Sequence, residues 1–141
     1  MANTTKKIAL MTALATALCT SLSIQAADMS RGANNFYVSQ QLNSKTVHFK
    51  NAYDMELAGT LFTPKNMQSD KKYPAIIVGH PFAAVRQQSA NLYAQKMADA
   101  GFITLTFDQS FWGESTGEPR GAVLPDVYSE NFSAAVDYLT T

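Results

Sequence analysis

One stretch, Tyr73–Phe82, constrains the fold more than any other part of the sequence. Its middle, Ala75–Val78, is an uninterrupted run of small and β-branched apolar residues that begins after a proline. Strands that are covered on both faces have such runs, whereas half-exposed strands alternate apolar and polar residues. The run ends at Gly79-His80-Pro81, which turns the backbone. We therefore expect a central parallel strand whose carboxyl end lies at the edge where open α/β sheets bind ligands.

The residues before this strand have the pattern of a hairpin. Apolar and polar side chains alternate in residues 45–50 and again in residues 55–64, which suits two half-buried strands. Residues 51–54 between them are turn formers. The sequence therefore predicts an antiparallel hairpin.

The residues after the strand predict a helix and a second strand. Residues 89–100 have helical spacing, Gly101 stands where a helix ends, and residues 102–107 read as the next strand. A strand, a helix of this length and a strand form a βαβ crossover, in which the two strands are parallel neighbours. The apolar face expected for the helix consists of Leu92, Tyr93, Met97 and Ala100.

A last helix follows a glycine-rich loop at residues 108–125. We expect Asp126 to cap this helix, which runs to the end of the sequence at Thr141. A crossover helix packs on a sheet because the next strand pairs beside the previous one, so a further strand is expected after Thr141. The expected apolar face consists of Tyr128, Phe132, Ala135, Val136 and Leu139.

The amino terminus, residues 1–27, has the order of a secretory signal peptide. A positively charged start precedes an apolar stretch at residues 8–18, and small residues lead to a cleavage point after Ala26 or Ala27. The alternative is an uncleaved membrane anchor, but the apolar stretch is short for a span. We expect an exported protein, periplasmic or secreted, without a stable membrane span after cleavage. The single cysteine, Cys19, lies in this segment, so no disulfide is expected.

The rest of the sequence divides into a polar leader at residues 28–43 and one partial domain at residues 44–141. The 11 basic and 11 acidic residues balance, which gives no reason to expect nucleic acid as a partner. The two histidines, His48 and His80, are too isolated to form a metal site, and no cofactor is expected.

Two loops carry a resemblance to a known family. The first is the Gly79–Phe82 turn, and the second follows Asp108 and includes Gly113-Glu114-Ser115-Thr116-Gly117-Glu118-Pro119-Arg120. With the hairpin and the βαβ unit, they resemble the amino-terminal half of an α/β-hydrolase, most closely the dienelactone-hydrolase-like and acyl-peptidase-like esterases. The resemblance implies an incomplete three-layer α/β sandwich and a small-molecule ester-like substrate.

The resemblance also assigns roles at the first loop. It implies that the backbone N–H of Phe82 is one donor of the oxyanion hole, which stabilises the charge of a tetrahedral intermediate. Pro81 has no N–H and stiffens the loop, and His80 is structural, because the catalytic histidine of this family comes last in the chain. Asp108 is either catalytic or, as we favour, supports the following loop.

Ser115 lies in a literal match to the nucleophile motif G-x-S-x-G, at residues 113–117. A nucleophile elbow joins a buried strand directly to a helix, whereas residues 108–112 separate this motif from its strand, and Pro119 and Gly121 exclude a helix behind it. Ser115 is therefore a weak nucleophile candidate, and the elbow is expected on a later strand.

Other side chains of the second loop have open interpretations. Glu114 and Glu118 are expected to be solvated, and Arg120 to pair with one of them. Phe111 and Trp112 either line an acyl pocket or cover the end of the sheet.

Two functions follow from the sequence. The first is an exported esterase-like hydrolase, truncated before its nucleophile and therefore inactive as this chain. The second is a non-catalytic exported binding module or a degraded hydrolase paralogue. In both cases the missing neighbour strand would leave the edge of Ala75–Val78 open, so self-association through that edge is expected.

Overall fold

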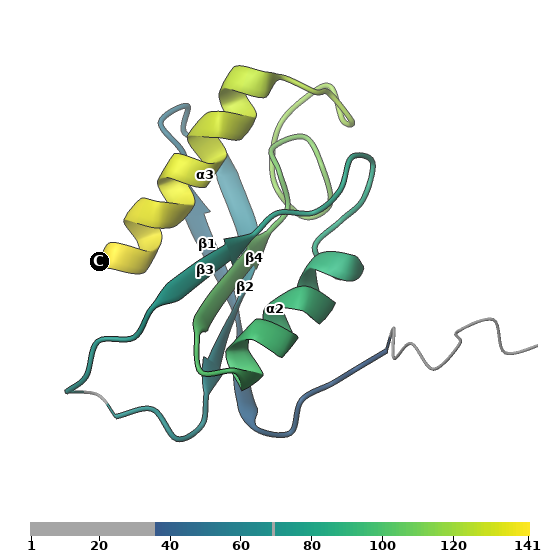
Figure 1. Cartoon of the computed structure of the whole chain (residues 1–141). Helices are drawn as coiled ribbons and strands as arrows, with labels where there is room; N and C mark the ends of the chain where they lie inside the picture. The colour runs from purple at the N-terminus through teal and green to yellow at the C-terminus, as the bar shows by residue number, and fades with distance from the viewer. Residues whose placement is uncertain (1–35, 69) are drawn as a thin grey trace, which may run out of the picture. The chain divides into compact units, whose positions relative to one another are not determined.

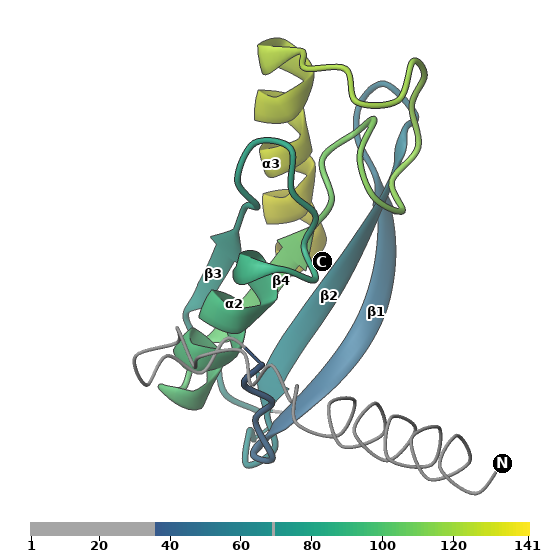
Figure 2. The ribbon, with the colours of Figure 1, turned by 90° about the vertical axis from the view of Figure 1, so that its right-hand side faces the viewer.

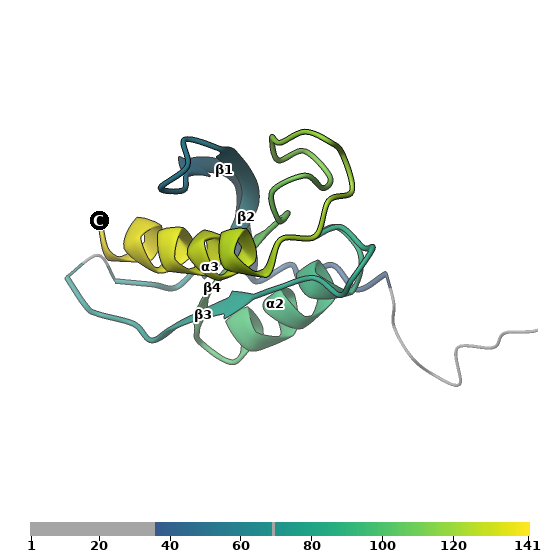
Figure 3. The ribbon, with the colours of Figure 1, turned by 90° about the horizontal axis from the view of Figure 1, so that it is seen from above.

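The computed structural model of the chain describes residues 36–68 and 70–141. They form a four-stranded sheet in the order β1-β2-β4-β3 with a helix on each face, α2 on one side and α3 on the other, as Figures 1 and 3 show. The expected α/β architecture, in its incomplete form, is confirmed. The expected signal peptide and the first half of the leader, residues 28–35, lie outside the described residues. No helix within the described ranges is long and apolar enough to cross a membrane.

The hairpin consists of β1 (Leu42–Lys50) and β2 (Glu56–Pro64), which pair antiparallel along their whole length (Figure 2). The turn between them is closed by a 3.1 Å hydrogen bond from the N–H of Asn51 to the carbonyl of Met55. The expected hairpin is confirmed, and its first strand begins at Leu42, before the expected residue 45. Leu42 is buried, so the end of the expected leader contributes to the core.

The parallel pair consists of β3 (Ala75–Val78) and β4 (Ile103–Phe107), which confirms the βαβ crossover. The other side of β4 pairs antiparallel with β2. Within the described residues β3 therefore lies at the edge of the sheet and is only partly buried. The open edge expected for Ala75–Val78 is thereby confirmed, and β3 is not central among the described strands.

Helix α2 (Ser89–Asp99) occupies the expected residues, but the expected apolar face is wrong. The helix buries Ala90, Ala94 and Ala98 against the sheet, whereas Tyr93 and Met97 are exposed. Small side chains allow a closer approach, and the Thr104 hydroxyl of β4 donates a 3.0 Å hydrogen bond to the carbonyl of Ala94.

Gly101 ends α2 as expected. Its φ of 100° is in the left-handed region, and its N–H donates to the carbonyl of Ala98 at 2.9 Å. The N–H of Phe102 donates to the carbonyl of Met97 at 3.4 Å. These two bonds satisfy carbonyls at the helix end in the pattern of a Schellman motif.

Helix α3 (Pro125–Thr140) packs on the opposite face. Leu124 occupies the N-cap position without a side-chain hydrogen bond, so the expected cap by Asp126 is wrong. Pro125 stands at the first helical position, where its missing N–H costs nothing and its fixed φ suits the helix. Asp126 lies in the first turn instead.

The buried face of α3 differs in part from the expected one. Asn131, Ala134 and Ala135 are buried, whereas Phe132 is 38% and Val136 50% exposed. Other residues of the helix complete the core with aromatic pairs, since Tyr138 stacks on Phe49 of β1 with ring centres 5.1 Å apart. The remaining members of this core are Val47, Leu57, Leu105 and Phe107.

Candidate active site

Two loops meet at the carboxyl ends of β3 and β4. We call residues 79–88, between β3 and α2, the first loop, and residues 108–124, between β4 and α3, the second loop. Figure 2 shows both at the same end of the sheet. A 3.0 Å hydrogen bond from the N–H of Gln109 to Nε2 of His80 joins them directly.

The tip of the first loop is a tight turn, Pro81–Ala84, closed by a 3.2 Å hydrogen bond from the N–H of Ala84 to the carbonyl of Pro81. Ala83 has a φ of 57°, the positive value that a type II turn requires at its third position. Phe82 occupies the second position, is 79% exposed, and its N–H has no hydrogen-bond partner among the described residues. This places an available backbone donor at the edge of the sheet.

His80 anchors one side of this turn. Its Nδ1 lies 2.8 Å from the carbonyl oxygen of Pro81, and its Nε2 accepts the hydrogen bond from Gln109. Because Nε2 accepts, the proton of the neutral ring is on Nδ1, which donates to Pro81. Both ring nitrogens are therefore engaged within the loops, and the imidazole supports the turn that presents Phe82.

Arg86 anchors the other side, a role that the sequence analysis did not predict. The residue is 3% exposed, and its N–H donates to Oδ1 of Asp108 at 2.7 Å while its guanidinium binds Oδ2 of the same carboxylate. The guanidinium also donates to Oε2 of Glu114 at 2.6 Å and to Oγ1 of Thr60 at 3.2 Å. The first loop is thereby tied to β2, to the end of β4 and to the second loop.

Asp108 is fully buried and joins the two loops. Besides Arg86, it accepts a 3.0 Å hydrogen bond from the N–H of Glu114. A buried carboxylate needs such a partner, since an isolated one is strongly disfavoured away from water. Its contacts support the loops, and no described histidine lies among them.

Glu114 was expected to be solvated, but its carboxylate has two partners in the loops. Its carboxylate contacts Arg86 and accepts a 3.1 Å hydrogen bond from the side-chain amide of Gln87. The hydrogen bond that Arg86 donates, together with the charge of Arg86, holds the pKa of Glu114 below its ordinary value.

Ser115 is buried, and its hydroxyl has two backbone partners. It donates to the carbonyl of Asp108 at 2.6 Å and accepts from the N–H of Ala58 at 2.9 Å. The hydroxyl thus holds the second loop on β2, and no described side chain offers it a base. Its geometry is that of a structural serine.

Arg120 binds carbonyl oxygens of the second loop, so the expected pair with Glu114 or Glu118 is wrong. The guanidinium donates to the carbonyls of Ser115 at 2.6 Å and Gly113 at 2.8 Å. The carboxylate of Glu118 accepts a 3.1 Å hydrogen bond from the backbone N–H of Arg120, and the guanidinium takes the carbonyls that the curved loop brings together.

A buried polar network that sequence analysis missed supports the second loop from α3. The amide of Asn51 donates to Oδ1 of Asn131 at 2.7 Å, and Asn131 donates to the side-chain carbonyl of Gln109 at 2.8 Å. Asn51 must donate here, since its own oxygen accepts from the N–H groups of Tyr53 and Met55. The network therefore connects the hairpin turn, α3 and the residue that binds His80.

A pocket of about 350 Å³ lies between the two loops and the start of α3. Trp112 lines it, whereas Phe111 is buried beneath the second loop, so the two aromatic residues have different positions. The lining also contains His80, Pro81, Phe82, Ala83, Gln109, Val123, Tyr128 and Phe132. No group of three potential metal-ligating side chains occurs within the described ranges.

The sequence and fold of this chain are similar to those of known proteins. The uncharacterised protein PA2218 of Pseudomonas aeruginosa is 49% identical over 105 residues, 74% of this chain and 28% of that protein. Its crystal structure has a TM-score of 0.71 at 47% identity, covering 77% of this chain and 33% of that one. The α/β hydrolase GrgF from Penicillium sp. sh18 has a TM-score of 0.62 at 24% identity, and the match covers 70% of this chain and 32% of that one. Brefeldin A esterase, a bacterial homologue of human hormone sensitive lipase, has a TM-score of 0.57 at 15% identity, and the match covers 72% of this chain and 27% of that one.

These residues form the amino-terminal part of an α/β-hydrolase fold. The chain spans about a third of the length of the curated relatives it matches. No family model matches the sequence.

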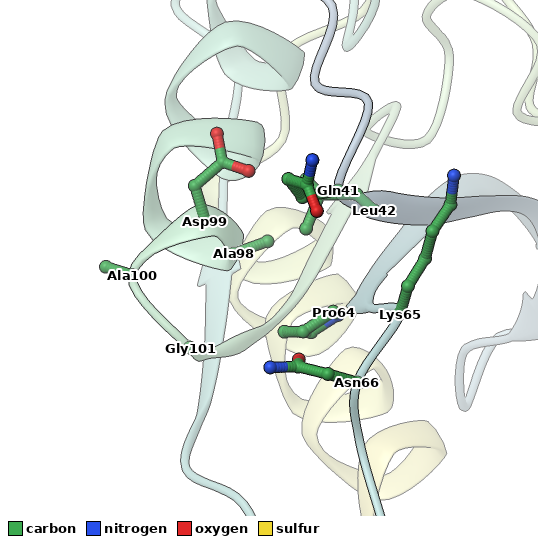
Figure 4. Close-up of a pocket in the computed structure, with 9 residues that line it drawn as sticks. All are labelled: Gln41, Leu42, Pro64, Lys65, Asn66, Ala98, Asp99, Ala100 and Gly101. Carbon is green, nitrogen blue, oxygen red and sulfur yellow. The ribbon is translucent and has the colours of Figure 1, made fainter.

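A second pocket, shown in Figure 4, lies at the other end of the sheet from the two loops. The ends of β2 and α2 and the start of β1 surround it, with Lys65 and Asp99 as its charged side chains. Ligands of open α/β sheets bind at the carboxyl ends of the parallel strands, where the His80 and Phe82 loop lies. The pocket between the two loops is therefore the better candidate site.

Proposed function

We propose that these residues supply part of the active site of an esterase-like acyl hydrolase. The observation that carries the proposal is the N–H of Phe82, which is exposed, without a partner among the described residues, and held on a turn anchored from both sides. In this role the amide donates to the oxyanion of a tetrahedral intermediate. Similarity to proteins named as an α/β hydrolase and an esterase supports the same reaction class.

The two anchors matter because an oxyanion donor acts through preorganisation. A donor that is already in place costs no reorganisation when charge develops, and one such hydrogen bond contributes roughly 3–4 kcal/mol to the transition state. His80 and Arg86 bind neighbouring residues, Gln109 and Asp108, so both ends of the first loop rest on the end of β4.

We further propose that the 141-residue chain alone has no hydrolytic turnover. The sequence contains two histidines, and both are engaged: His80 within the loops, and His48 beside Glu56 at 3.4 Å on the hairpin. Ser115, the serine of the motif, is buried and bonded to the backbone. In this proposal the nucleophile, the acid and the catalytic histidine belong to further residues of a complete polypeptide.

The proposal is tested by Phe82→Pro in the complete polypeptide that carries these residues. Proline is favoured at the second position of a type II turn, so the substitution removes the N–H while suiting the backbone. We expect kcat on p-nitrophenyl esters to fall about 10²–10³-fold. Phe82→Ala, which removes the same ring from the pocket but keeps the N–H, is the matched control, and the fall in kcat is measured relative to it. Equal turnover of the proline and alanine variants would remove Phe82 from the oxyanion hole.

The second candidate function is a non-catalytic binding module, which the pocket and the absence of a described nucleophile–base pair favour. Turnover decides between the two, because a binding module shows none even as a complete polypeptide.

Export and self-association complete the proposal. A signal peptide at residues 1–27 predicts a mature terminus at residue 27 or 28, which amino-terminal sequencing of the secreted or periplasmic protein checks. The open edge of β3 predicts association of the isolated chain, because exposed strand edges are templates for pairing. A monodisperse monomer in light scattering would contradict it.

A further inference from the structure

We propose that the pocket between the two loops binds an uncharged apolar group, an aryl ring or a medium-length aliphatic chain. If the proposed function holds, this group is the acyl part of the ester, because Phe82 both lines the pocket and offers the oxyanion amide. The binding itself does not depend on turnover, so it is tested separately.

The lining of the pocket contains no carboxylate, lysine or arginine. Two of its polar side chains already have partners, since the indole N–H of Trp112 and the hydroxyl of Tyr128 both donate to the carbonyl of Ala122, at 3.1 and 2.9 Å. Burial raises the pKa of Tyr128, which keeps its phenol neutral. A charged ligand would lose hydration here without gaining an ionic partner.

Aromatic rings form the walls. The rings of Phe82 and Trp112 are 6.0 Å apart in an edge-to-face arrangement. The ring of Phe132, on α3, packs edge to face on the ring of Phe107, with ring centres 5.2 Å apart. This contact fixes the position of the Phe132 ring in the pocket wall. Such walls offer ring faces and edges to a planar or flexible apolar ligand, and aromatic contacts add to the gain from burial.

The volume limits the ligand. The pocket encloses about 350 Å³, at the lower end of ordinary small-molecule sites. An apolar cavity of about 150 Å³ is already large enough for benzene. The space therefore suits a benzoyl or phenylacetyl group or a chain of similar bulk, and it leaves a short acetyl group poorly packed.

Trp112 is the only tryptophan in the sequence, so its fluorescence reports on this pocket. We expect benzamide, a neutral aryl probe that is not hydrolysed readily, to change the emission in a saturable manner. Sodium benzoate has nearly the same shape but a charge, and we expect it to bind at least about tenfold more weakly. Acetamide is expected to give no saturable change. Equal binding of benzoate and benzamide, or no response to benzamide up to its solubility, would overturn the proposal.

Val123→Phe tests the location, because it adds a ring to an exposed residue of the pocket wall. We expect benzamide binding to weaken at least about tenfold. Val136→Phe is the matched control, since Val136 is exposed on α3 outside the pocket and the same change there leaves binding unaltered. Unchanged binding in Val123→Phe would place the ligand elsewhere. Benzamide binding without ester hydrolysis in the complete polypeptide would reject the hydrolase and retain the pocket.

Discussion

The two loops at the carboxyl ends of the parallel strands differ in whether their polar groups have hydrogen-bond partners. The first loop leaves the N–H of Phe82 without a partner among the described residues and exposes its side chain. The second loop binds its own groups: the hydroxyl of Ser115 has two backbone partners, and Arg120 collects carbonyl oxygens. The first loop presents an available donor at the surface, and the second loop holds the first loop in place.

This difference shows why a motif is a weak guide to the reacting group. The sequence match to a nucleophile motif lies in the second loop, around a serine whose hydroxyl is bonded to the backbone. The candidate functional group of the first loop is a backbone N–H, which every residue except proline has, and no side chain identifies it. Availability of the group, and not its chemical type, distinguishes the two loops.

The largest effect is expected from Arg86→Ala, which removes the connection between the loops. Asp108 would remain fully buried without its cation, and breaking a buried pair in this way costs about 3–5 kcal/mol. Urea denaturation of the wild-type and Arg86→Ala chains measures this loss as a difference in the free energy of unfolding.

The exposed pair of Lys50 and Asp54, with atoms 2.9 Å apart, provides the control. Lys50→Ala is expected to leave the free energy of unfolding nearly unchanged, because solvent screens such pairs. A similar small change for Arg86→Ala would mean that Asp108 finds another partner and that the first loop has a single anchor.

A smaller effect is expected from Ser115→Ala. The substitution leaves the N–H of Ala58 and the carbonyl of Asp108 without their bridge, at a cost of about 1–3 kcal/mol in unfolding free energy. Denaturation measures the cost, and Ser129→Ala, on the exposed face of α3, is the matched control. Turnover of the complete polypeptide per folded molecule is expected to persist. Full stability with lost turnover would instead make Ser115 the nucleophile.

The sequence predicted what local patterns determine. The hairpin, the βαβ crossover and the end of α2 at Gly101 followed from alternation, run length and turn residues. The buried face of α2 did not, because Ala90, Ala94 and Ala98 carry a weaker apolar signal than Tyr93 and Met97, and packing distance decided between them.

The supports of the site were unpredictable for a different reason. Arg86 meets Asp108 across 22 residues and Glu114 across 28, and Asn131 meets Asn51 across 80. No spacing rule connects residues so far apart, since the fold alone brings them together. The resemblance to α/β-hydrolases implied a supporting role for His80, and its two hydrogen bonds lie within the loops.

The smallest effect concerns Glu114, which lies on the exposed side of the Arg86 contacts. Because Arg86 lowers the pKa of Glu114 in the folded chain, the carboxylate contributes stability above its unfolded pKa, near 4.5, and loses it as the pH falls through the lower folded value. Urea midpoints of the wild type and Glu114→Gln are therefore expected to differ slightly at about pH 6 and to converge by about pH 3. Glu118→Gln, on the same loop but bonded only to the N–H of Arg120, is the control and shows no such convergence. A gap that widens toward acid would reverse the sign and show that Glu114 does not complete the charge cluster which joins the loops.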